Sequence, residues 1–143
     1  MAATKKMDLL TAMEQIVEKA KGSKLGAEFY REANIYIGYV AERLELTKEQ
    51  SVMLALFVEN SFNFSICISN FCEFLDCRTT RIIRYMADID VLEKREFVRC
   101  SRCGKYSTYR VQAEVVDAFK RNEKFVPKNC SGLSCQELFA EIE

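Results

Sequence analysis

The sequence predicts a mainly α-helical protein of the α+β class, and three observations support this prediction. Apolar residues recur at helical spacing over most of the 143 residues. Two short segments rich in β-branched and aromatic residues flank the glycine of "RCGK" (102–105), a pattern typical of a β-hairpin. The apolar share of 49% and the charged share of 29% are those of a globular domain with a sizeable core.

Three helices are expected in the first part of the chain. The first covers residues 7–21 and stops at a glycine, and the second covers residues 27–45. The second has an apolar stripe, which consists of Phe29, Ala33, Tyr36, Val40 and Leu44. Thr47 and Gln50 have the Thr-x-x-Gln spacing of a capping box, so a third helix should begin there and run to about Asn60.

The middle of the chain changes its periodicity. "FSICIS" (64–69) is rich in β-branched and aromatic residues and predicts a short strand. Ser69 and Asn70 are good caps for a short helix that ends at Asp76. A longer helix is then expected from about Thr79 to Glu93.

The hairpin follows this longer helix directly. Its strands are predicted in "REFVRCS" (95–101) and "YSTYRV" (106–111), with a turn centred on Gly104. A helix over about 113–122 comes next, and Ser134 with Glu137 marks the start of another helix in the tail.

Taken in order, the elements of the middle and later chain are those of a winged helix-turn-helix, in which the hairpin is the wing. We therefore predict that residues 47–126 form this unit and that residues 1–46 are an N-terminal helical extension. Residues 127–143 are predicted to be a linker and the start of a further helix.

Arginines at spacing three distinguish the predicted second helix of the helix-turn-helix. On a helical wheel Ile82, Met86 and Ile89 form the inner side, while Thr80, Arg81, Arg84 and Asp88 lie opposite, with Arg78 near the first turn. In a helix-turn-helix the outer, N-terminal part of this helix approaches the DNA groove. Arginine suits such contacts because its planar fork binds a phosphate, or guanine O6 and N7, at two points.

Charge is distributed unevenly along a chain whose formal net charge is zero. Residues 78–110 contain nine Lys or Arg against four Asp or Glu, an asymmetry that indicates one working face. We therefore predict duplex DNA as a partner. The predicted contact residues are Arg78, Thr80, Arg81, Arg84, Arg99, Arg102 and Lys105.

Two alternatives remain open for this basic region. The arginines are also compatible with an ordinary solvated helix face, with Arg84 paired to Asp88 four residues later. A winged helix can also serve as a docking module for a protein partner or a second copy of the chain, since fold alone does not define function.

The seven cysteines are expected to stay reduced, because no export signal precedes them. The expected location is therefore the cytoplasm, and the longest apolar run, residues 52–58, is far too short to span a membrane. No bound metal is expected. A weaker alternative is a zinc site, whose four candidate ligands are Cys100, Cys103, Cys130 and Cys135.

The sequence offers no catalytic residues. It contains no histidine, so neither a Ser-His nor a Cys-His nucleophile is possible. Its five glycines are scattered and form no phosphate-binding loop of the Gly-x-x-x-x-Gly-Lys type. We expect neither catalysis nor a cofactor in this chain.

Three segments nevertheless resemble a known family. They are "FCEFLDCRTTRIIRYMADIDVLEKREFVR", "YRVQAEVVDAFKRNEKFVP" and "SGLSCQELFAEIE", within residues 45–143. These segments are similar to the N-terminal region of AAA-family ATPases of the Bacteroides type. The resemblance implies a winged-helix-like regulatory domain of a longer ATP-binding protein, whose ATPase core is then a partner of this chain. It carries over no ATPase residue, because the segment with the nucleotide-binding motifs is absent here.

Overall fold

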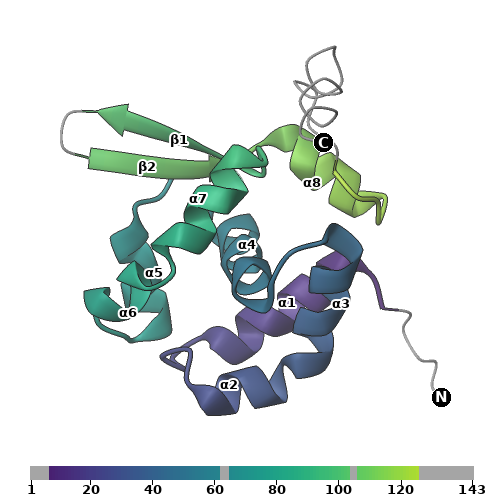
Figure 1. Ribbon diagram of the computed structural model, residues 1–143, viewed down its shortest axis with the longest axis horizontal. Helices are drawn as coiled ribbons and strands as arrows, with labels where there is room; N and C mark the ends of the chain where they lie inside the picture. The colour runs from purple at the N-terminus through teal and green to yellow at the C-terminus, as the bar shows by residue number, and fades with distance from the viewer. Residues whose placement is uncertain (1–6, 62–64, 104–105, 126–143) are drawn as a thin grey trace, which may run out of the picture.

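The structure, a computed structural model, describes residues 7–61, 65–103 and 106–125. These ranges contain eight helices and one two-stranded antiparallel sheet (Figure 1), which confirms the predicted α+β class. The helices are α1 (Leu9–Ala20), α2 (Ala27–Glu32), α3 (Asn34–Leu44), α4 (Lys48–Asn60), α5 (Ile68–Leu75), α6 (Thr79–Ile83), α7 (Met86–Lys94) and α8 (Ala113–Lys120). The strands are β1 (Val98–Cys103) and β2 (Tyr106–Val111).

Helix α4 lies at the centre of the molecule (Figure 1). It begins with the predicted capping box: the Thr47 hydroxyl accepts from the Gln50 N–H at 3.1 Å, and the Gln50 side chain accepts from the Thr47 N–H at 3.1 Å. All residues from 51 to 57 are buried, because α1, α3, α7 and β2 all contact this helix. A helix that is apolar on every side belongs in a core.

The predicted helix over residues 27–45 is divided into α2 and α3. The division falls at Ala33, whose φ of −95° and ψ of 5° lie outside the helical region. Ala33 itself is fully buried. Of the predicted apolar stripe, all members except the half-buried Tyr36 are buried, so the helical pattern identified the inner side correctly.

The strand predicted at residues 64–69 is reduced to an isolated bridge. Ile66 exchanges both backbone hydrogen bonds with Tyr109 of β2, at 2.9 and 2.8 Å. Helix α5 then begins at Ile68 rather than at Asn70, because the Asn70 side chain accepts from the Cys67 N–H at 2.9 Å. Asn70 thus helps to cap the helix from its third position, and the prediction that Ser69 or Asn70 precedes the helix was wrong.

The predicted helix from Thr79 to Glu93 is also interrupted. It consists of α6 and α7, and between them the Tyr85 N–H bonds to the Ile82 carbonyl, three residues back, at 2.7 Å. The α6 sequence "TTRII" contains four β-branched residues, which have lower helix propensity. Ile82 and Ile89 are buried as predicted, Met86 is half-buried, and the ring of Tyr85 is buried as well.

One hydrophobic cluster joins buried residues from Leu9 to Phe125. It includes residues on both sides of the predicted boundary at residue 46, so α1 and α3 pack into the same core as the hairpin. The hairpin pairs Val98 with Val111 at its base; its predicted turn at Gly104 lies outside the described residues, as does the predicted tail helix. No helix within the described ranges has both the length and the hydropathy needed to cross a membrane.

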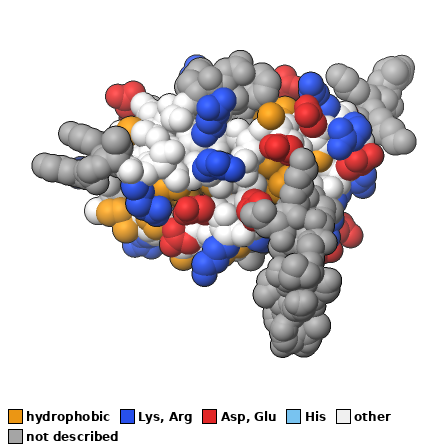
Figure 2. All heavy atoms as spheres, turned by 90° about the horizontal axis from the view of Figure 1, so that it is seen from above, with side chains coloured by type: hydrophobic (Ala, Val, Ile, Leu, Met, Phe, Trp, Pro, Cys, Tyr) orange, Lys and Arg blue, Asp and Glu red, His pale blue; other side chains and the backbone are white. Residues whose placement is uncertain are grey.

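The surface that carries the hairpin and α8 has mixed charge. Figure 2 looks onto this end of the molecule, which is at the top of Figure 1, and shows Lys and Arg side chains interspersed with Asp and Glu. This end therefore presents no continuous basic patch in that view.

The two adjacent isoleucines of α6 give a matched test of the fold. Ile82 is fully buried, whereas Ile83 is 58% exposed. We expect Ile82→Ala to lower the free energy of unfolding by about 2–5 kcal/mol, because it leaves a cavity in the core. Ile83→Ala should change it by about 0.5 kcal/mol or less. Urea unfolding of both variants measures the difference, and equal losses would contradict the burial of Ile82.

Candidate functional site

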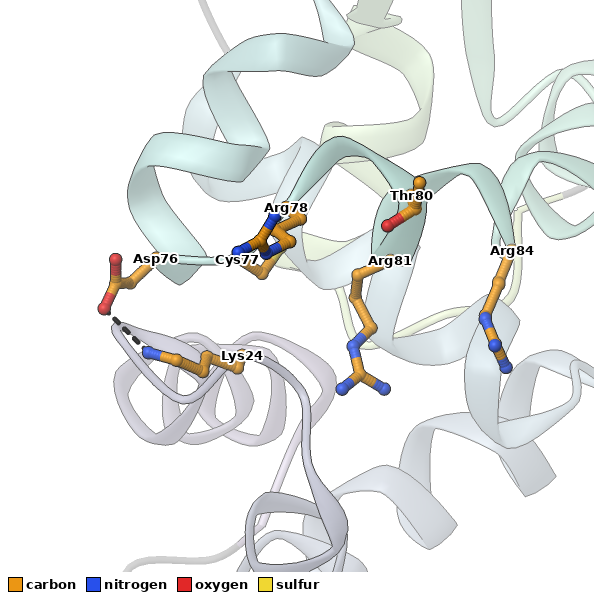
Figure 3. A pocket seen from close by; sticks show the side chains of 7 residues that line it. All are labelled: Lys24, Asp76, Cys77, Arg78, Thr80, Arg81 and Arg84. Carbon is orange, nitrogen blue, oxygen red and sulfur yellow. Dashed lines mark hydrogen bonds and ion pairs between the residues drawn. The ribbon is translucent and has the colours of Figure 1, made fainter.

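A cavity in the described part of the chain lies between α6 and the loop that joins α1 to α2. Its volume is about 700 Å³. Figure 3 shows Arg81 and Arg84 extending in the same direction from α6, toward the N-terminal helices. The residues that line it are Lys24, Asp76, Cys77, Arg78, Thr80, Arg81 and Arg84. All four residues predicted on the α6 side of the interface, Arg78, Thr80, Arg81 and Arg84, therefore line one cavity.

The turn between α5 and α6 places these side chains. Asp76 ends α5 in the left-handed conformation, with φ of 57°, and the Cys77 N–H returns to the Cys72 carbonyl at 3.1 Å. Arg78 is extended and precedes the first turn of α6. From there the spacing of three residues keeps Arg81 and Arg84 on one side of a helical turn.

The opposite wall is the α1–α2 loop, which is attached to the end of α5 through backbone hydrogen bonds. The Gly22 N–H donates to the Phe74 carbonyl at 3.0 Å, and the Lys24 N–H donates to the Leu75 carbonyl at 2.9 Å. Gly22 and Lys24 have positive φ, 67° and 62°, a conformation that costs energy for a lysine. The loop is thus held in a strained but defined shape next to the arginines.

Lys24 and Asp76 join the two walls by an ion pair. Lys24 Nζ lies 2.8 Å from Asp76 Oδ2 (Figure 3). The hydrogen bond and the charge of Lys24 hold the pKa of Asp76 below its usual value. Both side chains are exposed, so solvent screens the pair and it adds little to stability. Its main consequence is that the Asp76 carboxylate is already paired with Lys24 and does not neutralise the arginines of the cavity.

The guanidinium groups of Arg78, Arg81 and Arg84 have no hydrogen-bond or ion-pair partner among the described residues. Other arginines differ: Arg43 donates to the Asn122 carbonyl at 2.6 Å, and Arg95 donates to the carbonyls of Leu44 and Glu45. The predicted pairing of Arg84 with Asp88 does not form within the described chain. Three uncompensated positive charges therefore face one cavity.

Asp88, predicted on the same helix face as the arginines, does not line the cavity. It is half-buried, and burial together with the charge of Glu49 in α4 raises the pKa of its carboxyl group. Of the predicted polar face, the cavity lining thus includes Thr80, Arg81 and Arg84 but not Asp88.

The predicted hairpin residues are arranged differently. Arg102 NH1 lies 3.8 Å from Glu93 of α7, so its charge is partly neutralised. Arg99 stands opposite Arg110 in the strand register and donates to Gln112 at 3.0 Å. A second cavity of about 270 Å³ adjoins Arg99 and Arg110. Lys105, the remaining predicted contact, lies outside the described residues.

Of the four candidate zinc ligands, Cys100 is the one whose side chain is described. Cys100 is half-buried and hydrogen-bonded to Tyr109. Burial of Tyr109, together with this bond, raises the pKa of its phenol to about 12. The side chain of Cys103 is not described, and Cys130 and Cys135 lie outside the described residues. In the ranges that are described, no three His, Cys, Asp or Glu side chains are grouped as a metal would require.

A pair of tyrosines joins the N-terminal helices to the α6–α7 junction. The hydroxyl groups of Tyr30 in α2 and Tyr85 lie 2.6 Å apart. Burial raises the pKa of both phenols, and for Tyr30 the bond to Tyr85 raises it further. This contact fixes α2 against the end of α6 and so adds a second link between the elements that border the cavity.

Sequence reasoning missed Lys24 and Asp76. Both have positive φ, and Lys24 lies in "GSKLG" (22–26), whose composition predicts only a loop. Their side chains are 52 positions apart in the sequence, and no local pattern reports such a distant contact.

The fold and the site define an α+β domain with an arginine-lined cavity. A comparison with protein-family models, with curated proteins and with solved structures finds no match to this chain.

Alkaline pH tests the tyrosine pair. Both folded-state pKa values lie above the ordinary value of 10.0, so stability from this pair is complete below about pH 10 and falls as pH rises further. We expect wild-type protein to lose more unfolding free energy between about pH 9 and 11 than the Tyr30→Phe, Tyr85→Phe double variant does. Lysine titration is common to both proteins, and parallel stability curves would contradict the pair.

Proposed function

We propose that this chain is a winged helix-turn-helix domain that binds duplex DNA through α6 and the hairpin. One observation supports this proposal most. Three arginines at spacing three line one cavity and have no partner among the described residues: Arg78, Arg81 and Arg84. A guanidinium without a protein partner is available for a phosphate or a guanine edge. Thr80, on the same turn, adds a hydroxyl that can donate to a phosphate.

The order and pairing of the elements support the winged assignment. Helices α4, α5 and α6–α7 precede the hairpin, and the Ile66 bridge adds a short third segment beside β2. We interpret this order as a helix-turn-helix followed by a wing. Figure 1 shows the hairpin and α6 on the same side of the molecule, above and below one another on the left. In this proposal Arg99 and Arg110 of the hairpin contact the phosphate backbone of the DNA.

The family resemblance extends this proposal to a longer protein. In it, the domain is the non-catalytic N-terminal part of an AAA-family ATPase, needs no cofactor of its own, and regulates or targets the ATPase core. This part rests on the resemblance of residues 45–143 alone.

A protein-docking function is the second candidate, and one observation favours it. Ile83 is 58% exposed beside Arg84, and arginine is one of the residues enriched in protein interfaces. In that case the same arginines pair with acidic groups of a protein partner or of a second copy of the chain.

Fluorescence anisotropy with a pool of labelled duplexes at low salt tests the DNA proposal. We expect Arg81→Ala and Arg84→Ala each to weaken binding by about 1–3 kcal/mol, because each removes a phosphate or base contact. Arg121→Ala is the matched control: Arg121 is an exposed arginine at the end of α8 that forms an ion pair with Glu123. It should bind DNA as wild type does.

The hairpin has a more specific test. Glu93→Gln removes the charge that engages Arg102, so it should strengthen binding and steepen its dependence on salt by roughly one phosphate contact. Wild-type protein that shows no salt-dependent binding to any duplex would contradict DNA binding and leave the docking proposal in its place.

A further inference from the structure

The shape of the arginine site limits what can enter it. The three arginines line a hollow of about 700 Å³ between α6 and the α1–α2 loop. This is in the range of small-molecule sites, about 300–1,000 Å³. A duplex can reach the rim of such a hollow but cannot fill it, whereas a short chain of linked phosphates can.

We propose that this cavity is a binding site for small, multiply charged phosphate compounds, namely linear oligophosphates and the triphosphate moiety of nucleotides. The site goes beyond DNA binding, because its occupant is a free ligand held inside the cavity. In this proposal Arg78, Arg81 and Arg84 bind the phosphates with bidentate hydrogen bonds, while Lys24 on the opposite wall neutralises Asp76.

Charge complementarity supports this ligand class. The cavity lining contains four cations and one acid, Asp76, whose carboxylate is already bound by Lys24 at 2.8 Å. The three arginine charges have no partner in the described chain. Their mutual repulsion is relieved by a ligand that brings several negative charges close together, and a single monovalent anion relieves it much less.

The site is also preorganised. Two backbone hydrogen bonds hold the α1–α2 loop on α5, and the Tyr30–Tyr85 contact holds α2 on the α6–α7 junction. Lys24 stays in the left-handed conformation without a glycine's freedom. Walls fixed in advance lower the ordering cost of binding.

The lining predicts which part of a nucleotide is recognised. Apart from Cys77, the described lining residues are charged or carry a hydroxyl group, and none is aromatic. A base would find no ring on which to stack. The phosphates alone are therefore recognised, and the identity of the base should not matter.

Isothermal titration calorimetry at matched ionic strength tests the site with defined probes. We expect wild-type protein to bind inorganic tripolyphosphate, ATP and GTP with similar affinity, orthophosphate at least tenfold more weakly, and adenosine not at all. Binding of adenosine, or a marked preference between ATP and GTP, would overturn recognition through phosphate alone. Absence of tripolyphosphate binding would overturn the site itself.

Charge variants locate the binding. Arg81→Ala and Arg84→Ala should each weaken tripolyphosphate binding about tenfold, and Arg121→Ala should leave it unchanged. Asp76→Asn should strengthen it, since it removes the only acid in the lining and asparagine tolerates the left-handed backbone at this position. Circular dichroism confirms that each variant is folded. Equal affinities across wild type and the arginine variants would place any binding elsewhere and overturn the proposal.

A DNA arm separates this proposal from the proposed function. In one outcome the protein binds tripolyphosphate, Arg81→Ala weakens this binding, and no duplex binds. That outcome supports the phosphate site and contradicts only the DNA proposal. Duplex binding in a protein that binds no tripolyphosphate supports DNA binding and overturns the site. Where both bind, tripolyphosphate should displace the duplex, because both use Arg81 and Arg84.

Discussion

The contact on which the remaining structure depends is at the C-terminal end of α4, at Phe57 and Ser61. The Phe57 ring packs edge-on against Phe71 of α5, with centroids 4.9 Å apart, and lies 5.6 Å from the ring of Tyr109 in β2. The buried Ser61 hydroxyl donates to the Phe57 carbonyl at 2.7 Å and accepts from the Val111 N–H at 3.2 Å. One end of one helix therefore positions both α5 and the hairpin. The arginine cavity depends on it indirectly, since α5 leads into the turn that presents Arg78.

Local patterns predicted most of the elements, and their failures have more than one cause. The Thr47 capping box, the hairpin and the inner positions Ile82 and Ile89 were all correct, because each is encoded within a few residues. The interruption after Arg84 was not predicted, because it is stabilised by the contact of Tyr85 with Tyr30, 55 positions away. The strand at Ile66 shrank to one bridge for a different, local reason. Ile68, the next residue that could pair with β2, is already the first residue of α5, whose start is capped by the bond from the Cys67 N–H to the Asn70 side chain.

The candidate site was likewise predictable where it depends on local sequence. The spacing of three residues identified Arg78, Arg81 and Arg84 as one set, and it did so because spacing in a helical turn is local. The cavity itself was not predictable, since its second wall is a loop from the start of the chain, attached through the carbonyls of Phe74 and Leu75. Composition also overstated the positive charge of the hairpin. A count of charged residues includes Arg102, but the nearby Glu93 carboxylate partly neutralises it.

Pairing, rather than net charge, explains how a formally neutral chain presents arginines that have no partner among the described residues. Arg95 binds the carbonyl groups at the end of α3 and lies over the ring of Phe97, 5.3 Å from its centroid, so its charge serves the fold. Lys124 and Arg121 are paired with Glu45 and Glu123. The arginines of the cavity, in contrast, have no ion-pair partner among the described residues, and the acid in the described lining, Asp76, is already bound by Lys24. Electrostatic attraction weakens within about 10 Å at ordinary salt concentrations. An incoming phosphate therefore responds to this local surplus and not to the balance of the whole chain.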